Sequence, residues 1–132
     1  MKLTLLSSIY SLRNYSGQLF VAARCLNIEI WTTTLSPQID GDKPVIIDFW
    51  ATWCGPCKVI GPVFERFSDQ APFSDKLEFY KVDVDEQQQI ASEVGIQAMP
   101  TFVAFHKGQA VKKVVGANPG ALQNALKEIS EL

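Results

Sequence analysis

The sequence lacks much of what several classes of protein require. Its three cysteines are too few, and odd in number, for a small domain held together by disulfides, and its single histidine leaves a zinc site short of four ligands. No apolar run reaches the roughly 18 residues needed to span a bilayer. The net charge of −2 argues against nucleic acid as the main partner, because phosphate binding favours a basic surface.

What is present has the composition of one globular domain. The chain has 132 residues, of which 47% are hydrophobic and 20% are charged. Those values exclude collagen-like and disordered classes and allow a core of ordinary size. We therefore expect a single domain, with neither nucleic acid nor a membrane among its partners.

Charge is distributed unevenly along the chain. The first 28 residues contain three bases and no acid, so the remainder has nine bases against all 14 acids. The same segment contains four serines, and acid-free stretches with Arg and Ser are typical of organelle transit peptides. We therefore divide the chain into residues 1–27, a transit peptide or disordered extension, and a domain over 28–132, and we expect a mitochondrial location.

Two other interpretations of the amino-terminal segment stay open. It is an ordinary extension of a cytoplasmic protein, or it is a secretory signal. The second fits less well, because the apolar stretch over 3–9 is interrupted by Thr and Ser and no small-residue cleavage pattern follows it. Cys25 lies beside this segment and receives no function, since a lone cysteine is usually a small hydrophobe or a bystander.

The rest of the chain alternates between strand and helix patterns. In chain order, the predicted elements are a strand over 44–50, a helix over 54–70, a strand over 77–84, a short helix over 85–95 with a capping-box-like start, strands over 101–106 and 110–115, and a helix capped by Asn118. The first two strands should pair in parallel, and the last two should form an antiparallel hairpin. This order predicts an α/β fold with a mixed central sheet and helices on both of its faces.

The most informative stretch is Trp-Cys-Gly-Pro-Cys-Lys at residues 53–58. Two cysteines three apart at a helix start lie within about 5–6 Å at Cβ, close enough to adjust to a disulfide. The free amides and the dipole of the helix N-terminus stabilise a thiolate at the first position. Cys54 is therefore expected to be the nucleophile and Cys57 the resolving thiol. An inert pair and a zinc site are the alternatives, and the absence of a second pair of cysteines counts against zinc.

Asp48 interrupts an otherwise apolar strand, Val-Ile-Ile-Asp-Phe-Trp. Such an acid lies either on a solvated strand edge or in the interior. Burial raises the pKa of a carboxyl group, which suits it to proton transfer near neutral pH. A buried Asp48 could take the proton from Cys57 during exchange.

These residues carry a resemblance to a known family. Residues 45–58 resemble the active-site signature of thioredoxins, and the sequence is most similar in type to the fungal members. Three further segments stand where that family has matching elements: Asp-Val-Asp at 83–85, Met-Pro-Thr-Phe at 99–102 and Val-Gly-Ala at 115–117. The resemblance covers about residues 43–132 and implies the thioredoxin fold.

The resemblance also implies roles for individual residues. It makes Asp48 the proton acceptor for Cys57, and it makes Lys81 a modulator of that carboxylate, although a solvated strand lysine is the alternative. Gly55 and Pro56 would tune the redox pair. The implied substrate-binding residues are Trp53, Met99, Pro100, Gly116 and Ala117, with a cis bond before Pro100. Core packing is the alternative for Trp53, but its position directly before the nucleophile favours exposure. His106 is interpreted as a surface or packing residue.

The function implied is that of a protein disulfide reductase. It would act as a monomer on disulfide-containing proteins, without a bound cofactor or metal, and an NADPH-dependent thioredoxin reductase would regenerate it. An oxidase or isomerase is one alternative, but relatives with those tasks usually carry His between the cysteines, where this chain has Gly55-Pro56. A non-catalytic binding module that uses the surface around Trp53 is the other.

The start of the domain departs from the family pattern. Thioredoxins open with a strand and a helix, for which residues 18–23 and 28–35 are the available segments. The Trp-Thr-Thr-Thr run at 31–34 is a weak helix former, because β-branched side chains lose rotamer freedom in a helix. Either the first strand–helix unit is degenerate, or the start of this chain is not the one that the family would have.

Overall fold

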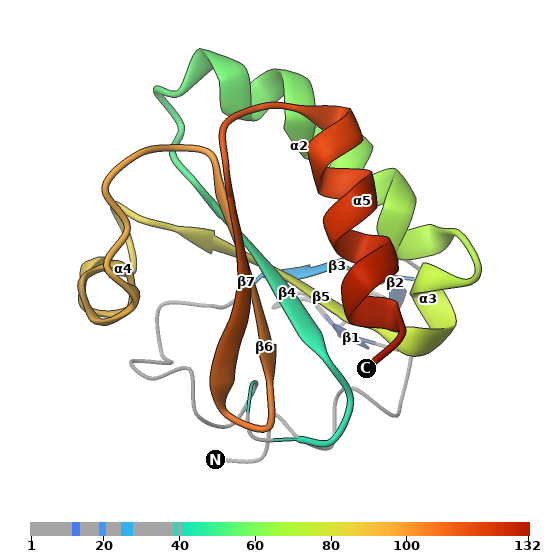
Figure 1. Ribbon diagram of the computed structural model, residues 1–132. Coiled ribbons are helices and arrows are strands. Elements are labelled where there is room, and N and C mark those ends of the chain that lie inside the picture. Colours follow the sequence, from blue (N-terminus) through green and yellow to red (C-terminus); the bar gives the residue numbers. More distant parts are fainter. Residues whose placement is uncertain (1–11, 14–18, 21–24, 28–38, 40) are drawn as a thin grey trace.

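The computed structural model describes residues 12–13, 19–20, 25–27, 39 and 41–132 (Figure 1). Its elements are β1 (Leu12–Arg13), β2 (Leu19–Phe20), β3 (Cys25–Asn27), β4 (Val45–Trp50), α2 (Gly55–Asp69), α3 (Phe73–Lys76), β5 (Glu78–Asp83), α4 (Gln88–Val94), β6 (Thr101–His106), β7 (Gln109–Val115) and α5 (Pro119–Ser130).

A mixed sheet forms the centre of the fold. Its strand order is β3-β5-β4-β6-β7, with β3, β5 and β4 parallel and with β6 and β7 antiparallel to their neighbours. The predicted mixed sheet, parallel at its first two strands and closed by a hairpin, is confirmed. The central strand β4 leads directly to the two cysteines, so the middle of the sheet sets the position of the site.

The two faces of the sheet are covered by different helices. Ile46 of β4 belongs to a core with Phe64 of α2 and Leu126 of α5, whereas Ile47 belongs to a second core with Ile90 of α4. Figure 1 shows α2 and α5 on one side of the sheet and α4 on the other. Because side chains alternate along a strand, Asp48 shares the face of Ile46 and points beneath α2.

Local signals explain where two of the helices end or begin. The Asn118 side chain accepts a hydrogen bond from the backbone N–H of Ala121 at 3.0 Å, so it caps α5 as predicted. Gly95 ends α4 in the left-handed conformation at φ +77°, which glycine adopts without steric cost.

The predicted start of α4 is wrong by one turn. The helix begins at Gln88, and its cap makes no side-chain hydrogen bond. The Asp83 carboxylate instead accepts hydrogen bonds from the backbone N–H groups of Asp85 and Glu86. This side chain holds the preceding residues in a turn, and the helix starts only after it.

The first strand of the sheet also differs from the prediction. Within the predicted segment 18–23, Leu19–Phe20 pairs with Leu12–Arg13 in a separate two-stranded sheet, and Cys25–Asn27 supplies the parallel strand beside β5. Three residues are too few to show a hydrophobic periodicity in a sequence, so the pattern could not locate them. The predicted helix over 28–35 lies outside the described residues.

Candidate active site

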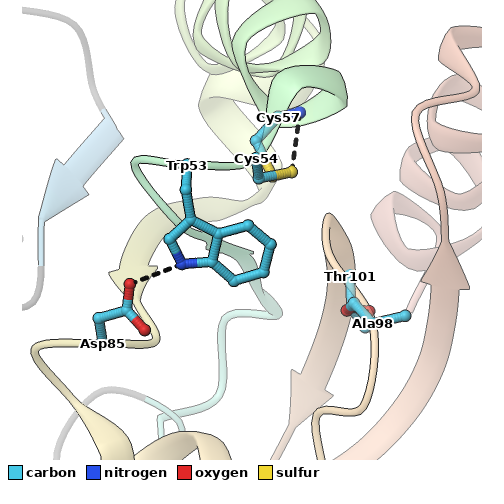
Figure 2. Close-up of a disulfide and its surroundings, with 6 residues drawn as sticks. All are labelled: Trp53, Cys54, Cys57, Asp85, Ala98 and Thr101. Carbon is cyan, nitrogen blue, oxygen red and sulfur yellow. Dashed lines mark hydrogen bonds between the residues drawn. A yellow bond between two sulfur atoms is a disulfide. The ribbon is translucent and has the colours of Figure 1, made fainter.

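The two cysteines lie where β4 gives way to α2. They form a disulfide with a Cα–Cα distance of 5.3 Å, and Cys54 is the N-cap residue of the helix (Figure 2). The Cys54 sulfur accepts a hydrogen bond from the backbone N–H of Cys57 at 3.2 Å. When the disulfide is reduced, the same donor and the positive end of the helix dipole favour a thiolate at Cys54.

Access to the sulfur atoms is narrow. Cys54 and Cys57 are 4% and 5% exposed, and they pack with Ala51 against Trp50 and Met99. Apolar side chains therefore surround the disulfide on several sides. A protein substrate can therefore reach a sulfur atom only by docking closely against this surface.

Trp53, directly before the nucleophile, is 66% exposed. Its indole N–H donates a hydrogen bond to the Asp85 carboxylate at 2.9 Å, and Figure 2 shows the ring extended between that acid and the disulfide. The hydrogen bond ties the loop before α2 to the loop after β5. A flat, exposed aromatic surface is thus held beside the disulfide.

The loop that precedes β6 lies against the same disulfide. The Met99–Pro100 peptide bond is cis, as the family resemblance implies, and Met99 packs on the cysteines. The carbonyl of Pro100 accepts a hydrogen bond from the Gly116 N–H at 2.9 Å, which brings the loop after β7 to this edge. Ala117 is exposed there, whereas Pro100 is itself buried. The five residues predicted to bind substrate therefore include one whose side chain does not reach the surface.

Asp48 lies beneath the disulfide, and it is 1% exposed. It borders a cavity of about 160 Å³ that Cys57 also lines. Its Oδ1 atom has no hydrogen-bond partner among the described residues. Burial raises the pKa of Asp48 to about 7, Lys81 lowers it in part, and Glu65 adds to the rise. A carboxyl with this pKa exchanges a proton readily near neutral pH.

Lys81 stands opposite Asp48 in the pairing of β4 with β5. Its ammonium group, however, lies 2.9 Å from the Glu65 carboxylate and 5.2 Å from the centre of the Trp50 ring. The sequence-based prediction places this lysine near the buried acid. The structure adds that its ion pair is made with another carboxylate.

A second cavity, of about 360 Å³, opens on the other side of Met99. Its walls come from Val84, from α4 and from the loop that follows it. Met99 thus lies between the disulfide and a hollow in the surface.

The described residues also bear on other kinds of site. No group of three or more His, Cys, Asp and Glu side chains could hold a metal ion there. His106 lies 3.0 Å from the carbonyl of Asp42. No helix in the described part of the chain is long and apolar enough to cross a membrane.

Comparison with known proteins places this geometry in a family. The thioredoxin family model matches residues 26–128. The chain belongs to the thioredoxin family. Thioredoxin from Malassezia sympodialis is 68% identical over 90 residues, which are 68% of this chain and 85% of the relative. Similar solved structures include two thioredoxins. One is the Malassezia sympodialis thioredoxin, at 57% identity with a TM-score of 0.74, over 80% of this chain and 90% of that one. The other is mitochondrial thioredoxin 3 from Saccharomyces cerevisiae, at 40% identity with a TM-score of 0.66, over 71% and 86% of the two chains.

Membership in the thioredoxin family settles the kind of chemistry. The protein is a thiol-disulfide oxidoreductase of the thioredoxin type, and its redox-active group is the Cys54–Cys57 disulfide. The thioredoxin fold that the sequence predicts is confirmed.

Two residues of this thioredoxin site escaped the sequence-based reasoning. Asp85 was interpreted as a helix start, and it instead orients Trp53. Glu65 lies within the predicted helix over 54–70 without an assigned role, and in the structure it binds Lys81. A signal for Glu65 was present, because Cys57, Gly61 and Glu65 follow at four-residue spacing and so share one side of the helix.

Proposed function

We propose that the protein reduces disulfides in other proteins by direct exchange, with Asp48 as the proton acceptor of the second step. One observation carries the proposal. The cysteine at the second position of the pair and the buried carboxyl of Asp48 line the same cavity. A proton that leaves Cys57 therefore has an acceptor within the same cavity.

The reaction starts from the dithiol form. The Cys54 thiolate attacks one sulfur of the substrate disulfide, a Cys54–substrate bond forms, and the other substrate sulfur leaves as a thiolate. Cys57 then transfers its proton to Asp48 and attacks the sulfur of Cys54. The Cys54–Cys57 bond forms, the mixed disulfide breaks, and the second substrate thiolate leaves. Two electrons pass from the dithiol to the substrate.

Regeneration of the dithiol needs an external source of two electrons. We infer that an NADPH-dependent thioredoxin reductase supplies them, in keeping with the family. One chain carries every residue of the site, which supports action as a monomer. Gly55 and Pro56 between the cysteines favour the reductant over an oxidase or isomerase. A measured equilibrium with glutathione tests this choice, and a strongly oxidising potential would reverse it.

Protein substrates should dock through the exposed ring of Trp53. We expect Trp53→Ala to raise the KM for insulin by roughly 30-fold, the effect of losing about 2 kcal/mol at an aromatic anchor. The small disulfide reagent DTNB makes no extended contact with the protein surface, so Trp53→Ala should change the rate of its reduction little. Val111→Ala is the matched control, because Val111 is 45% exposed at the end of β7 away from the site. An equal loss with both substrates would show that Trp53 acts on the cysteines instead.

The amino-terminal segment is proposed to be a mitochondrial presequence. Its lack of acids and its content of Arg and Ser support this, and one similar structure is of a mitochondrial thioredoxin. Since Cys25–Asn27 pairs with β5, removal is expected upstream of Cys25. Mass spectrometry of the protein purified from its source would locate the first residue, and a mature chain that retains Met1 would reject the presequence.

A further inference from the structure

The cavity beneath the disulfide brings together ionisable groups from three elements. Asp48 comes from β4, Lys81 comes from β5, and Cys57 and Glu65 come from α2. Cys57 and Glu65 are eight residues apart, with Gly61 between them, so all three lie along one row of the helix. The carboxylate of Glu65 therefore stands two helical turns from the resolving thiol, at the other end of a shared space.

Lys81 has two carboxylates within reach of its position in the sheet. Asp48 is its partner in the register of β4 and β5, yet the ammonium group is 2.9 Å from Glu65. Among the described residues no ion pair joins Lys81 to Asp48. Gly61 lies next to this ion pair, since a Cβ there would be in ordinary van der Waals contact with the Lys81 nitrogen, at 3.8 Å.

The burial of Lys81 and Asp48 makes it important which carboxylate Lys81 pairs with. The Lys81 side chain is 17% exposed and that of Glu65 is 45% exposed, so a mostly buried cation is held by a carboxylate at the edge of the solvent. A positive charge close to a buried carboxyl favours its ionised form. Without Glu65, Asp48 would be the nearest acid facing Lys81 across this cavity.

We propose that Glu65 is a positioning residue for disulfide exchange, whose carboxylate holds the Lys81 ammonium at the mouth of the cavity and away from Asp48, so that Asp48 stays available for the proton of Cys57. The proposal rests on the role given to Asp48 above. It assigns to the helix that carries the redox pair a second task, which is control of the charge beneath that pair.

Charged groups, and the thiol that reduction frees, face Asp48 from two of the elements packed against it. From α2 these are Cys57, Lys58 and Glu65, and from β5 the group is Lys81, whereas its partner in β6, Phe102, is uncharged. Burial is the largest cause of the raised pKa of Asp48, with Lys81 acting against it and Glu65 with it. Loss of Glu65 removes a negative charge and frees the lysine, and both changes lower the pKa of Asp48.

The first test is Glu65→Gln, with two readouts. Carbon-13 NMR of the Asp48 carboxyl should give a titration midpoint at lower pH than in the wild type. The rate at which a preformed mixed disulfide resolves should rise at acidic pH, where more Asp48 is ionised, and fall at alkaline pH, where a weaker base removes the proton. The two rate profiles therefore cross. Glu128→Gln is the matched control, because it breaks the exposed pair with Lys112, 2.7 Å apart, and it should leave both readouts unchanged.

The second test separates positioning from simple charge. In a Lys81→Met background there is no ammonium group to release, so Glu65→Gln should shift the Asp48 midpoint by less than half as much as in the wild type. Equal shifts in the two backgrounds, or no shift in the wild type, would overturn the proposal. An Asp48→Asn variant with a wild-type rate profile would reject Asp48 as the proton acceptor and the inference with it. If Asp48→Asn is slow and Glu65→Gln is unaffected, the inference alone is rejected.

Discussion

The Cys54→Ser variant is expected to lose essentially all reduction of insulin in the presence of NADPH and thioredoxin reductase. Serine keeps an oxygen at the helix N-cap, so the start of α2 should persist. It cannot, however, form the thiolate that attacks a disulfide. Removal of a covalent nucleophile lowers turnover by more than about a thousandfold in comparable cases. Turnover is followed by the loss of NADPH absorbance.

Cys57→Ser distinguishes the two thiols. This variant keeps the nucleophile and loses the thiol that resolves the mixed disulfide, so it should accumulate a covalent adduct with its substrate. The adduct is detected on a non-reducing gel and disappears with dithiothreitol. Cys25→Ser is the matched control and should turn over like the wild type. Adduct formation by Cys54→Ser instead would reverse the assigned roles.

Asp48→Asn is expected to make the oxidised protein more stable at pH 8, by up to about 4 kcal/mol. Burial raises the pKa of Asp48 from 3.8 to about 7, and a change of this size corresponds to about 4 kcal/mol. As the pH rises from about 4 to 7, the unfolded chain loses this proton before the folded one does, so the folded state loses stability. Asparagine does not ionise and avoids the loss.

Urea unfolding at pH 4.5 and pH 8 measures the effect. The gain in unfolding free energy from Asp48→Asn should be small near pH 4 and should grow until about pH 7, the pKa of the folded carboxyl. The exposed Asp42→Asn substitution is the control and should give the same small difference at both values. A gain that does not depend on pH would mean that the carboxyl is ionised at no cost. The same variant should resolve mixed disulfides slowly, so the acid is retained for its chemistry at the expense of stability.

Much of this site was predictable because its parts lie close together in the chain. A short apolar strand, two cysteines three apart and a helix pattern require no distant contact to be recognised. The helix cap at Asn118 was likewise local. For Asp48 the apolar neighbours left two possibilities, a solvated strand edge or the interior, and the structure shows that it is buried.

What could not be predicted depends on side chains that meet only in the folded protein. The turn held by Asp83 delayed the start of α4, and no helix signal contains that competing hydrogen bond. The choice of Lys81 between Glu65 and Asp48 depends on where α2 crosses the sheet, which a single sequence does not state. The bond from Trp53 to Asp85 joins residues 32 apart.

The position of Cys54 as the cap of α2 has a thermodynamic consequence. The helix holds a negatively charged sulfur better than a neutral one, so reduction and ionisation at Cys54 must strengthen the start of the helix by the same free energy with which the helix favours the thiolate. The reduction potential of the Cys54–Cys57 disulfide and the stability of α2 are therefore thermodynamically linked. A substitution anywhere in α2 that destabilises its first turn should therefore change the reduction potential of the Cys54–Cys57 pair.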